Sequence, residues 1–160
     1  MNYFLLKSEP TCFSIDDLAR DGQTSWTGVR NFQARNILRD DMNVGDLCLF
    51  YHSNACENNG IVWIMRVASE ALPDMTALDI HDEHYDSKST LENPIWITRT
   101  MEFVEKFPRT FTLTEIKSTP ELSGMEVARK GSRLSVNKVS KKDFEYILDI
   151  YRTQNKAKKT

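Results

Sequence analysis

The stretch Gly45-Asp46-Leu47-Cys48-Leu49-Phe50-Tyr51-His52-Ser53-Asn54 decides the fold, because it reads as a turn followed by one buried strand. An Asn-rich turn that ends at Gly60 leads into a second buried run, Ile61 to Ala68. A third run, Trp96 to Phe107, alternates in hydrophobicity, and this alternation places Ile97, Met101, Phe103 and Phe107 on one side of a strand. Strands joined by turns, without βαβ alternation, predict an α+β fold around a mostly antiparallel sheet.

Short helices and further strands flank this centre. Apolar runs at 3–6 and 133–136 predict two more strands. Helix N-cap signals are the feature that the remaining segments share, and they stand at Ser14, Asn31, Thr112 and Ser140. The last helix carries its apolar residues at helical spacing as far as Tyr151. We therefore expect one domain over residues 1–152 and a basic, frayed tail over 153–160.

Residues 69–94 show no clear period. Loops without secondary structure seldom exceed about 15 residues, so this segment is either a functional loop or contains short elements. Within it, His81 and His84 suggest a metal site, but no further ligand pair stands at a suitable spacing. A solvated acidic loop is the preferred interpretation, and we expect neither a metal nor a cofactor.

Composition limits the class of protein. The chain has 160 residues, of which 40% are hydrophobic and 28% charged, as is typical of a globular domain with its own core. No apolar run approaches a transmembrane span and the N-terminus lacks a signal-peptide pattern, so no membrane partner is expected. Three cysteines without a CxxC pair argue against a disulfide framework and for a reducing, cytoplasmic location.

The net charge of −2 limits how the chain can bind nucleic acid. Proteins that bind mainly through the phosphate backbone need a basic surface, and this chain has no overall excess of positive charge. Binding to nucleic acid would therefore depend mainly on a pocket.

The stretch Trp26-Thr27-Gly28-Val29-Arg30-Asn31-Phe32-Gln33-Ala34-Arg35-Asn36 combines an aromatic ring, a glycine turn, guanidinium groups and amides. Such a mixture suits a site that holds a planar, polar ring. Trp26 taken alone fits a buried core position better than a binding site, and Asn31 fits an ordinary helix cap. For Arg35, a surface charge pair and a binding role remain open alternatives.

Four further motifs accompany this stretch: Lys7-Ser8-Glu9-Pro10, the 45–54 strand, the acidic segment 85–94 and Gly131-Ser132-Arg133-Leu134-Ser135-Val136. In this order and spacing the chain resembles the EVE domain, a PUA-like family, from about Tyr3 to about Tyr151. The resemblance implies a PUA-like small, mostly antiparallel β-barrel with peripheral short helices. It also implies an aromatic-lined pocket for a modified base.

The resemblance implies roles for particular side chains of this sequence. The residues expected at the base pocket are Lys7, Ser8, Trp26, Gly28, Arg30, Asn31, Tyr51, Ser53, Asn54 and Ser135. The residues expected at its rim or against phosphate are Arg35, Lys130 and Arg133. Strand alternation places Tyr51 and Ser53 on one face, and we expect that face to be the pocket.

The function expected is a non-enzymatic module that binds modified DNA or RNA, one base in its pocket, with a monomer favoured. No GxSxG, P-loop, HExxH or paired zinc motif occurs. Two alternatives remain open. One is a small amidohydrolase resembling ASCH proteins, in which Lys7 and Glu9 act as acid–base groups. The other is a general RNA-binding PUA module that recognises shape.

Overall fold

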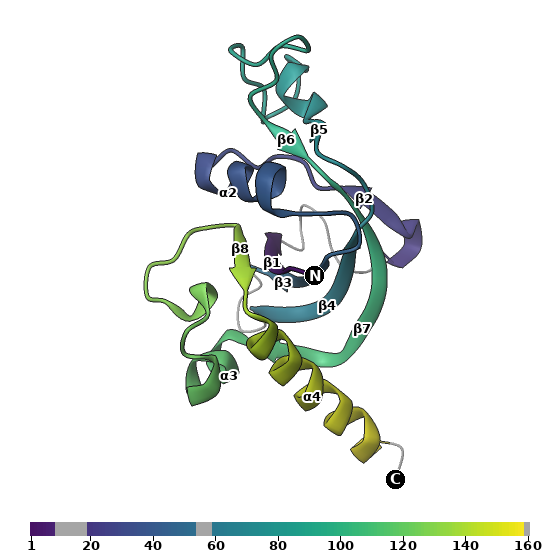
Figure 1. Ribbon diagram of the computed structural model, residues 1–160, viewed down its shortest axis with the longest axis vertical. Helices are drawn as coiled ribbons and strands as arrows, with labels where there is room; N and C mark the ends of the chain where they lie inside the picture. The colour runs from purple at the N-terminus through teal and green to yellow at the C-terminus, as the bar shows by residue number, and fades with distance from the viewer. Residues whose placement is uncertain (9–18, 54–58, 159–160) are drawn as a thin grey trace.

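A curled six-stranded sheet forms the centre of the computed structural model, which describes residues 1–8, 19–53 and 59–158 (Figure 1). The strand order is β2-β7-β4-β3-β1-β8. The strands are β1 (Tyr3–Ser8), β2 (Gln23–Ser25), β3 (Leu47–His52), β4 (Gly60–Val67), β7 (Thr100–Thr112) and β8 (Val136–Val139). Only β1 and β3 pair in parallel among the described strands. The sheet curls into a half-barrel with few short helices, which confirms the α+β, PUA-like fold class.

Helical segments pack against both faces of this sheet. They are α2 (Phe32–Asn36), the π-helix η1 (Ile37–Asp41), α3 (Leu113–Ser118), the 3-10 turns η4 (Pro120–Leu122) and η5 (Glu126–Ala128), and α4 (Lys141–Lys158). The predicted capping box is present at α3, where the Thr112 and Glu115 side chains cap each other's backbone N–H groups. Asn31 caps α2 by accepting a hydrogen bond from the Ala34 N–H at 3.0 Å. No helix in the described ranges is long and apolar enough to cross a membrane.

Residues 69–96 form a lobe that projects from one end of the half-barrel (Figure 1). The lobe contains β5 (Leu72–Pro73) and the 3-10 turn η3 (Met75–Leu78), and β5 pairs with β6 (Ile97–Thr98), which follows the lobe. The sequence left two alternatives for this segment, a functional loop or a stretch with short elements, and the structure shows that it contains short elements.

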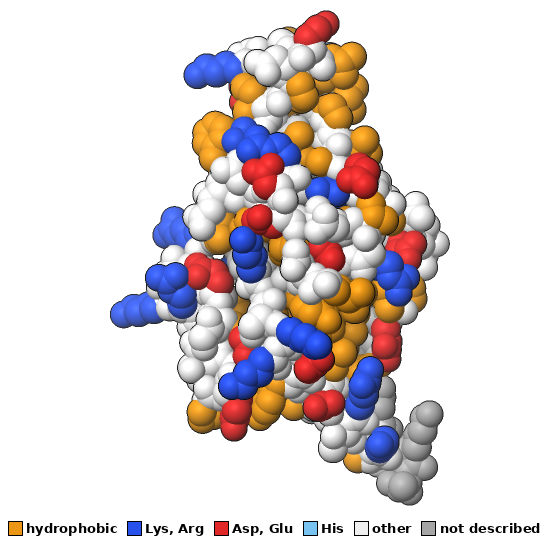
Figure 2. All heavy atoms as spheres, viewed as in Figure 1, with side chains coloured by type: hydrophobic (Ala, Val, Ile, Leu, Met, Phe, Trp, Pro, Cys, Tyr) orange, Lys and Arg blue, Asp and Glu red, His pale blue; other side chains and the backbone are white. Residues whose placement is uncertain are grey.

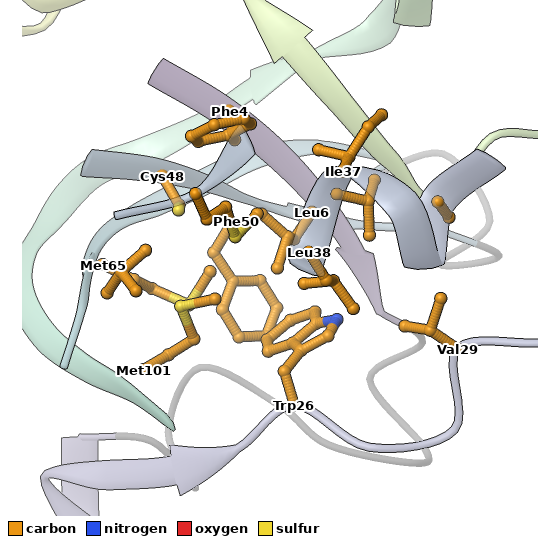
Figure 3. Packing of buried hydrophobic residues seen from close by; sticks show 14 of the residues in the cluster. Phe4, Leu6, Trp26, Val29, Ile37, Leu38, Cys48, Phe50, Met65 and Met101 are labelled. Carbon is orange, nitrogen blue, oxygen red and sulfur yellow. The ribbon is translucent and has the colours of Figure 1, made fainter. Parts of the chain in front are cut away.

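Strand alternation divides the core into two clusters, one on each face of the sheet. Phe4 and Phe50 point toward α2 and η1, where they pack with Leu38 (Figure 3). Their neighbours Leu5 and Leu49 point to the opposite face, which α3 and α4 cover. The sheet is thus buried on both faces, although only one of them leads to the site described below.

The expectation that Phe107 shares a face with Met101 and Phe103 is wrong. Met101 and Phe103 belong to the first cluster, whereas Phe107 belongs to the second. The register between β4 and β7 shifts between Ile64 and Met65. A bulge of this kind reverses the faces of the residues that follow, and the local sequence does not reveal it.

The bounds of three other elements can be compared with those predicted from the sequence. The last strand, β8, begins at Val136 rather than at Arg133. The final helix continues to Lys158, so most of the expected frayed tail is helical. The start of the short helix predicted from Ser14 lies outside the described residues, and residues 19–21 are helical.

Arg99 is a buried cation that joins the lobe to the half-barrel. Its side chain is 2% exposed, and it donates to the carbonyl oxygens of four residues: Leu38 (2.7 Å), Met42 (2.7 Å), Ser69 (3.0 Å) and Arg39 (3.2 Å). The end of a helix leaves carbonyl groups without intrahelical partners, and Arg99 satisfies those at the end of η1. Burial lowers the pKa of this guanidinium, and the Glu70 and Asp46 carboxylates act in the opposite direction.

We predict that Arg99→Ala lowers the free energy of unfolding by about 3–5 kcal/mol, because buried carbonyl groups lose their donor. Urea denaturation followed by tryptophan fluorescence measures this change. Arg66→Ala is the matched control, since Arg66 forms an exposed ion pair with Glu102 and should cost below about 1 kcal/mol. Equal losses in the two variants would contradict the role given to Arg99.

Candidate functional site

Polar strand ends meet at one edge of the sheet and border a hollow of about 910 Å³. Lys7 and Ser8 end β1, Ser53 follows β3, and Ser135 precedes β8. Since β1 and β3 run parallel and β8 runs antiparallel to β1, these positions fall at the same edge. Main-chain hydrogen bonds of 2.9 Å, from Lys7 N–H to Ser135 O and from Ser53 N–H to Ser8 O, hold the strand ends together. The volume is within the roughly 300–1,000 Å³ typical of small-ligand sites.

Trp26 forms a wall of the hollow and also belongs to the core. Its side chain packs edge-on against Phe50, with ring centroids 5.2 Å apart, and the residue is 7% exposed (Figure 3). The backbone is fixed as well, because Trp26 N–H donates to Arg99 O at 2.8 Å and the Thr98 hydroxyl donates to Trp26 O at 2.9 Å. Trp26 is therefore a core residue that also borders the hollow, and its position is rigid.

The Asp74 carboxylate ties the lobe to the turn that follows Trp26. It accepts hydrogen bonds from Gly28 N–H (2.9 Å), Arg30 Nη1 (2.9 Å), Thr76 N–H (3.0 Å) and the Thr76 hydroxyl (2.6 Å). Burial alone would raise the pKa of Asp74, but the hydrogen bonds from Thr76, Arg30 and Gly28 outweigh it and lower that pKa. A buried carboxylate with this many donors fixes both segments that supply them.

Gly28 brings the lobe close to the turn. Its φ of +83° is favourable only for glycine, and a Cβ atom there would lie 3.0 Å from the His84 ring. Arg30 Nε also donates to His84 O at 3.0 Å. The residues 81–84 are therefore held against the hollow.

An aromatic and guanidinium stack secures the outer side of the lobe. Phe32 stacks on Trp96 at 4.9 Å, Arg35 lies over Phe32 at 4.9 Å, and Arg30 lies over Trp96 at 5.3 Å. Arg35 Nη1 additionally donates to Ile95 O at 3.0 Å. Arg30 and Arg35 thus join the lobe to α2.

Charges of both signs border the hollow. Lys7 and Arg133 come from the strand-end side, and Asp82 and Glu83 come from the lobe. Burial lowers the pKa of the Lys7 ammonium, and the Glu126 carboxylate offsets part of that shift. A ligand in this hollow would meet cations on one element and carboxylates on another.

The structure brings together seven of the residues proposed for the site. Those that line the hollow are Lys7, Ser8, Trp26, Gly28, Ser53, Arg133 and Ser135. Arg30 does not line the hollow but donates to Asp74, which also binds the Gly28 turn at its border. Asn31 caps α2, and Arg35 belongs to the aromatic stack. Lys130 lines a neighbouring groove of about 270 Å³ that shares Arg133. Asn54 lies outside the described residues.

The structure corrects the position of Tyr51. Tyr51 is 3% exposed and packs with Leu49 in the second core cluster, where burial raises the pKa of its hydroxyl. Phe50, on the opposite face of β3, packs against Trp26 behind the hollow. Ser53 reaches the hollow although Tyr51 does not, because β3 ends at His52 and strict alternation ends with it.

Sequence reasoning missed the lobe's share of the lining, which consists of Thr76, His81, Asp82, Glu83 and His84. We interpreted residues 81–84 as a solvated acidic loop. The one signal available was the unusual length of the aperiodic segment 69–94. In the described part of the chain, no group of three or more His, Cys, Asp or Glu side chains is arranged to hold a metal ion.

Comparison with known proteins identifies relatives over nearly the whole chain. Residues 2–150 match the family model of the EVE domain. Thymocyte nuclear protein 1 of Gallus gallus is 40% identical over 168 residues, which cover 92% of this chain and 68% of that protein. A crystal structure of human THYN1 protein in complex with 5-methylcytosine containing DNA is 35% identical, with a TM-score of 0.86 and coverage of 94% and 98%.

A more distant structure shares the fold alone. The YTH domain of Zygosaccharomyces rouxii MRB1 protein, in complex with N6-methyladenosine RNA, has a TM-score of 0.56 at 15% identity, with coverage of 94% of this chain and 86% of that one.

We predict that Asp74→Asn lowers the free energy of unfolding at pH 7 by about 2–4 kcal/mol, because an amide cannot satisfy the same donors. The pKa of Asp74 is lowered in the folded protein, so its stabilisation is present above about pH 4, the ordinary aspartate value, and is lost as the pH falls below it. Unfolding free energies from pH 7 to 3 should therefore converge for the wild-type protein and the variant. A constant gap across that range would contradict this role.

Proposed function

The chain belongs to the EVE domain family, and we propose that it is a non-enzymatic nucleic-acid-binding module that holds one modified base in the hollow beside Trp26. The hollow is the observation that carries this proposal. It combines a rigid aromatic wall with hydroxyl groups at the strand ends, Ser8, Ser53 and Ser135. A flat base needs an apolar surface against its ring and hydrogen-bonding groups at its edge.

5-Methylcytosine in DNA is the first ligand to test. The human relative was crystallised with DNA that contains this base, and the likeness to it extends over nearly the whole chain. 5-Hydroxymethylcytosine and modified RNA bases are further candidates, because the hollow is large and polar. The YTH likeness supports the fold and carries no ligand to this chain.

The charge distribution supports pocket binding over backbone binding. On the face shown in Figure 2, Lys and Arg side chains are interspersed with Asp and Glu rather than gathered in one field. Near the hollow, Lys7 and Arg133 are placed to meet phosphate, with Lys130 in the adjoining groove. With about two or three phosphate contacts, the affinity should depend only weakly on salt.

We place the protein in a reducing, cytoplasmic setting and favour a monomer. Cys48 is a free thiol in the core, and burial and the nearby Asp46 carboxylate raise its pKa well above the ordinary value. A thiol in that state is unreactive and needs no partner cysteine.

One observation favours a hydrolase as the second candidate. The pKa of Lys7 is lowered by burial, as that of a catalytic base can be, and Lys7 lines the hollow together with Ser8, Ser53 and Ser135. Incubation with acylated or modified nucleosides distinguishes the two functions. Product that forms with the wild-type protein and is absent with Lys7→Ala would establish the hydrolase.

We predict that the protein binds a short single-stranded oligonucleotide more tightly when one base is modified, and that Ser53→Ala with Ser135→Ala weakens binding of the modified strand about 10-fold through two lost hydrogen bonds. Fluorescence anisotropy with 5-methylcytosine, 5-hydroxymethylcytosine, N6-methyladenine and unmodified strands measures the preference. Ser123→Ala is the control, since Ser123 is exposed and outside the lining.

Two results would contradict this prediction. Equal binding to modified and unmodified RNA would identify a general RNA-binding module instead. Failure to bind any strand would remove nucleic acid as the ligand.

A further inference from the structure

We propose that the lobe segment Asp82–Glu83 reads the exocyclic amino group of the bound base, so that the hollow selects amino bases over keto bases that carry the same methyl group. This inference rests on the proposed function, and it assigns a role to the part of the lining that comes from the lobe. It concerns which base enters, rather than whether a base enters.

Hydrogen bonds fix the position of the segment Asp82–Glu83. Asp82 N–H donates to Asp79 O at 3.0 Å, and Asp82 Oδ1 accepts the His84 N–H at 2.8 Å. His84 is in turn fixed by Arg30, which the buried Asp74 carboxylate holds. The position of Asp82 at the hollow therefore depends on hydrogen bonds that connect back to the half-barrel.

One oxygen of Asp82 remains available for a ligand. The contacts of its side chain involve Oδ1, which also lies 3.2 Å from His84 Nδ1. Among the described residues, Asp82 Oδ2 accepts no hydrogen bond. The Asp82 side chain is 28% exposed, so it is partly open to solvent. Glu83 is 79% exposed and lies 3.9 Å from His84 Nε2, which makes it the more adaptable of the two carboxylates.

The chemistry of the two sides of the hollow orients a nucleotide. Lys7 and Arg133 attract the phosphate and the strand-end serines meet part of the base edge, which leaves the exocyclic amino group for the lobe. Cytosine presents an N4 amino group and adenine an N6 amino group, and both donate to a carboxylate. Thymine and uracil present the O4 acceptor instead, which leaves the carboxylate without a donor and places two acceptors face to face.

Comparison of 5-methylcytosine with thymine isolates this effect, because both bases carry a methyl group at C5. A well-placed hydrogen-bonded pair discriminates between bases by about 5- to 100-fold. We expect a preference in this range for the wild-type protein.

The experiment is a titration of single-stranded oligonucleotides that are identical except at one position, which holds 5-methylcytosine, cytosine, thymine or uracil. The wild-type protein should prefer 5-methylcytosine to thymine by at least about 5-fold. Asp82→Asn with Glu83→Gln should reduce that preference to about 2-fold or less, because a side-chain amide can turn its oxygen to an amino group or its NH2 to a keto oxygen. The preference for 5-methylcytosine over cytosine should persist. Glu92→Gln, an exposed change in the same lobe outside the lining, should alter neither ratio.

The outcomes separate this inference from the proposed function. Equal binding of 5-methylcytosine and thymine, both tighter than cytosine and uracil, would overturn the inference and leave the methyl-base reader standing. An undiminished preference in the double variant, with the wild-type unfolding temperature retained, would also overturn the inference. Failure of the wild-type protein to bind any of the four strands would overturn both.

Discussion

The Asp74 carboxylate is the constraint on which the site depends. It is almost completely buried, so its charge is tolerated only because donors from the Gly28 turn, Arg30 and Thr76 surround it. The turn after Trp26 and the lobe are distant in sequence, and both donate hydrogen bonds to this one buried group. The lobe is thereby fixed as the side of the hollow that faces the strand ends.

The sequence predicts those parts of the fold that local patterns control. Apolar runs bounded by turns identify β3 and β4, and a Thr112–Glu115 pair is enough to start a helix because each side chain caps the other's backbone. Motif order supplies the family and hence the fold class. The strand-end residues Lys7, Ser8 and Ser135 come together because pairing of β1 with β8 follows from that fold.

The rest depends on contacts between segments far apart in the chain. Phe107 changes face at a bulge that is defined by pairing with β4. Tyr51 points to the second core cluster and away from the hollow, on the face that α3 and α4 cover. The lobe shows the same limit more strongly. Asp82 resembles any solvated acidic residue until Asp74 and Arg30 bring its segment to the hollow, and no local pattern records a hydrogen bond across 44 positions.

Strand β1 has consequences for the order in which the protein is assembled. Its second neighbour is β8, residues 136–139. The first strand of the sheet to be synthesised therefore gains its second partner only when the last strand of the sheet has been made. Until Val136 and Asn137 have left the ribosome, one side of Leu6 and Leu5 remains unpaired. Distant pairing of this kind slows folding and leaves an apolar strand exposed to other chains. A nascent chain of this protein is therefore most prone to aggregate just before its final helix is made.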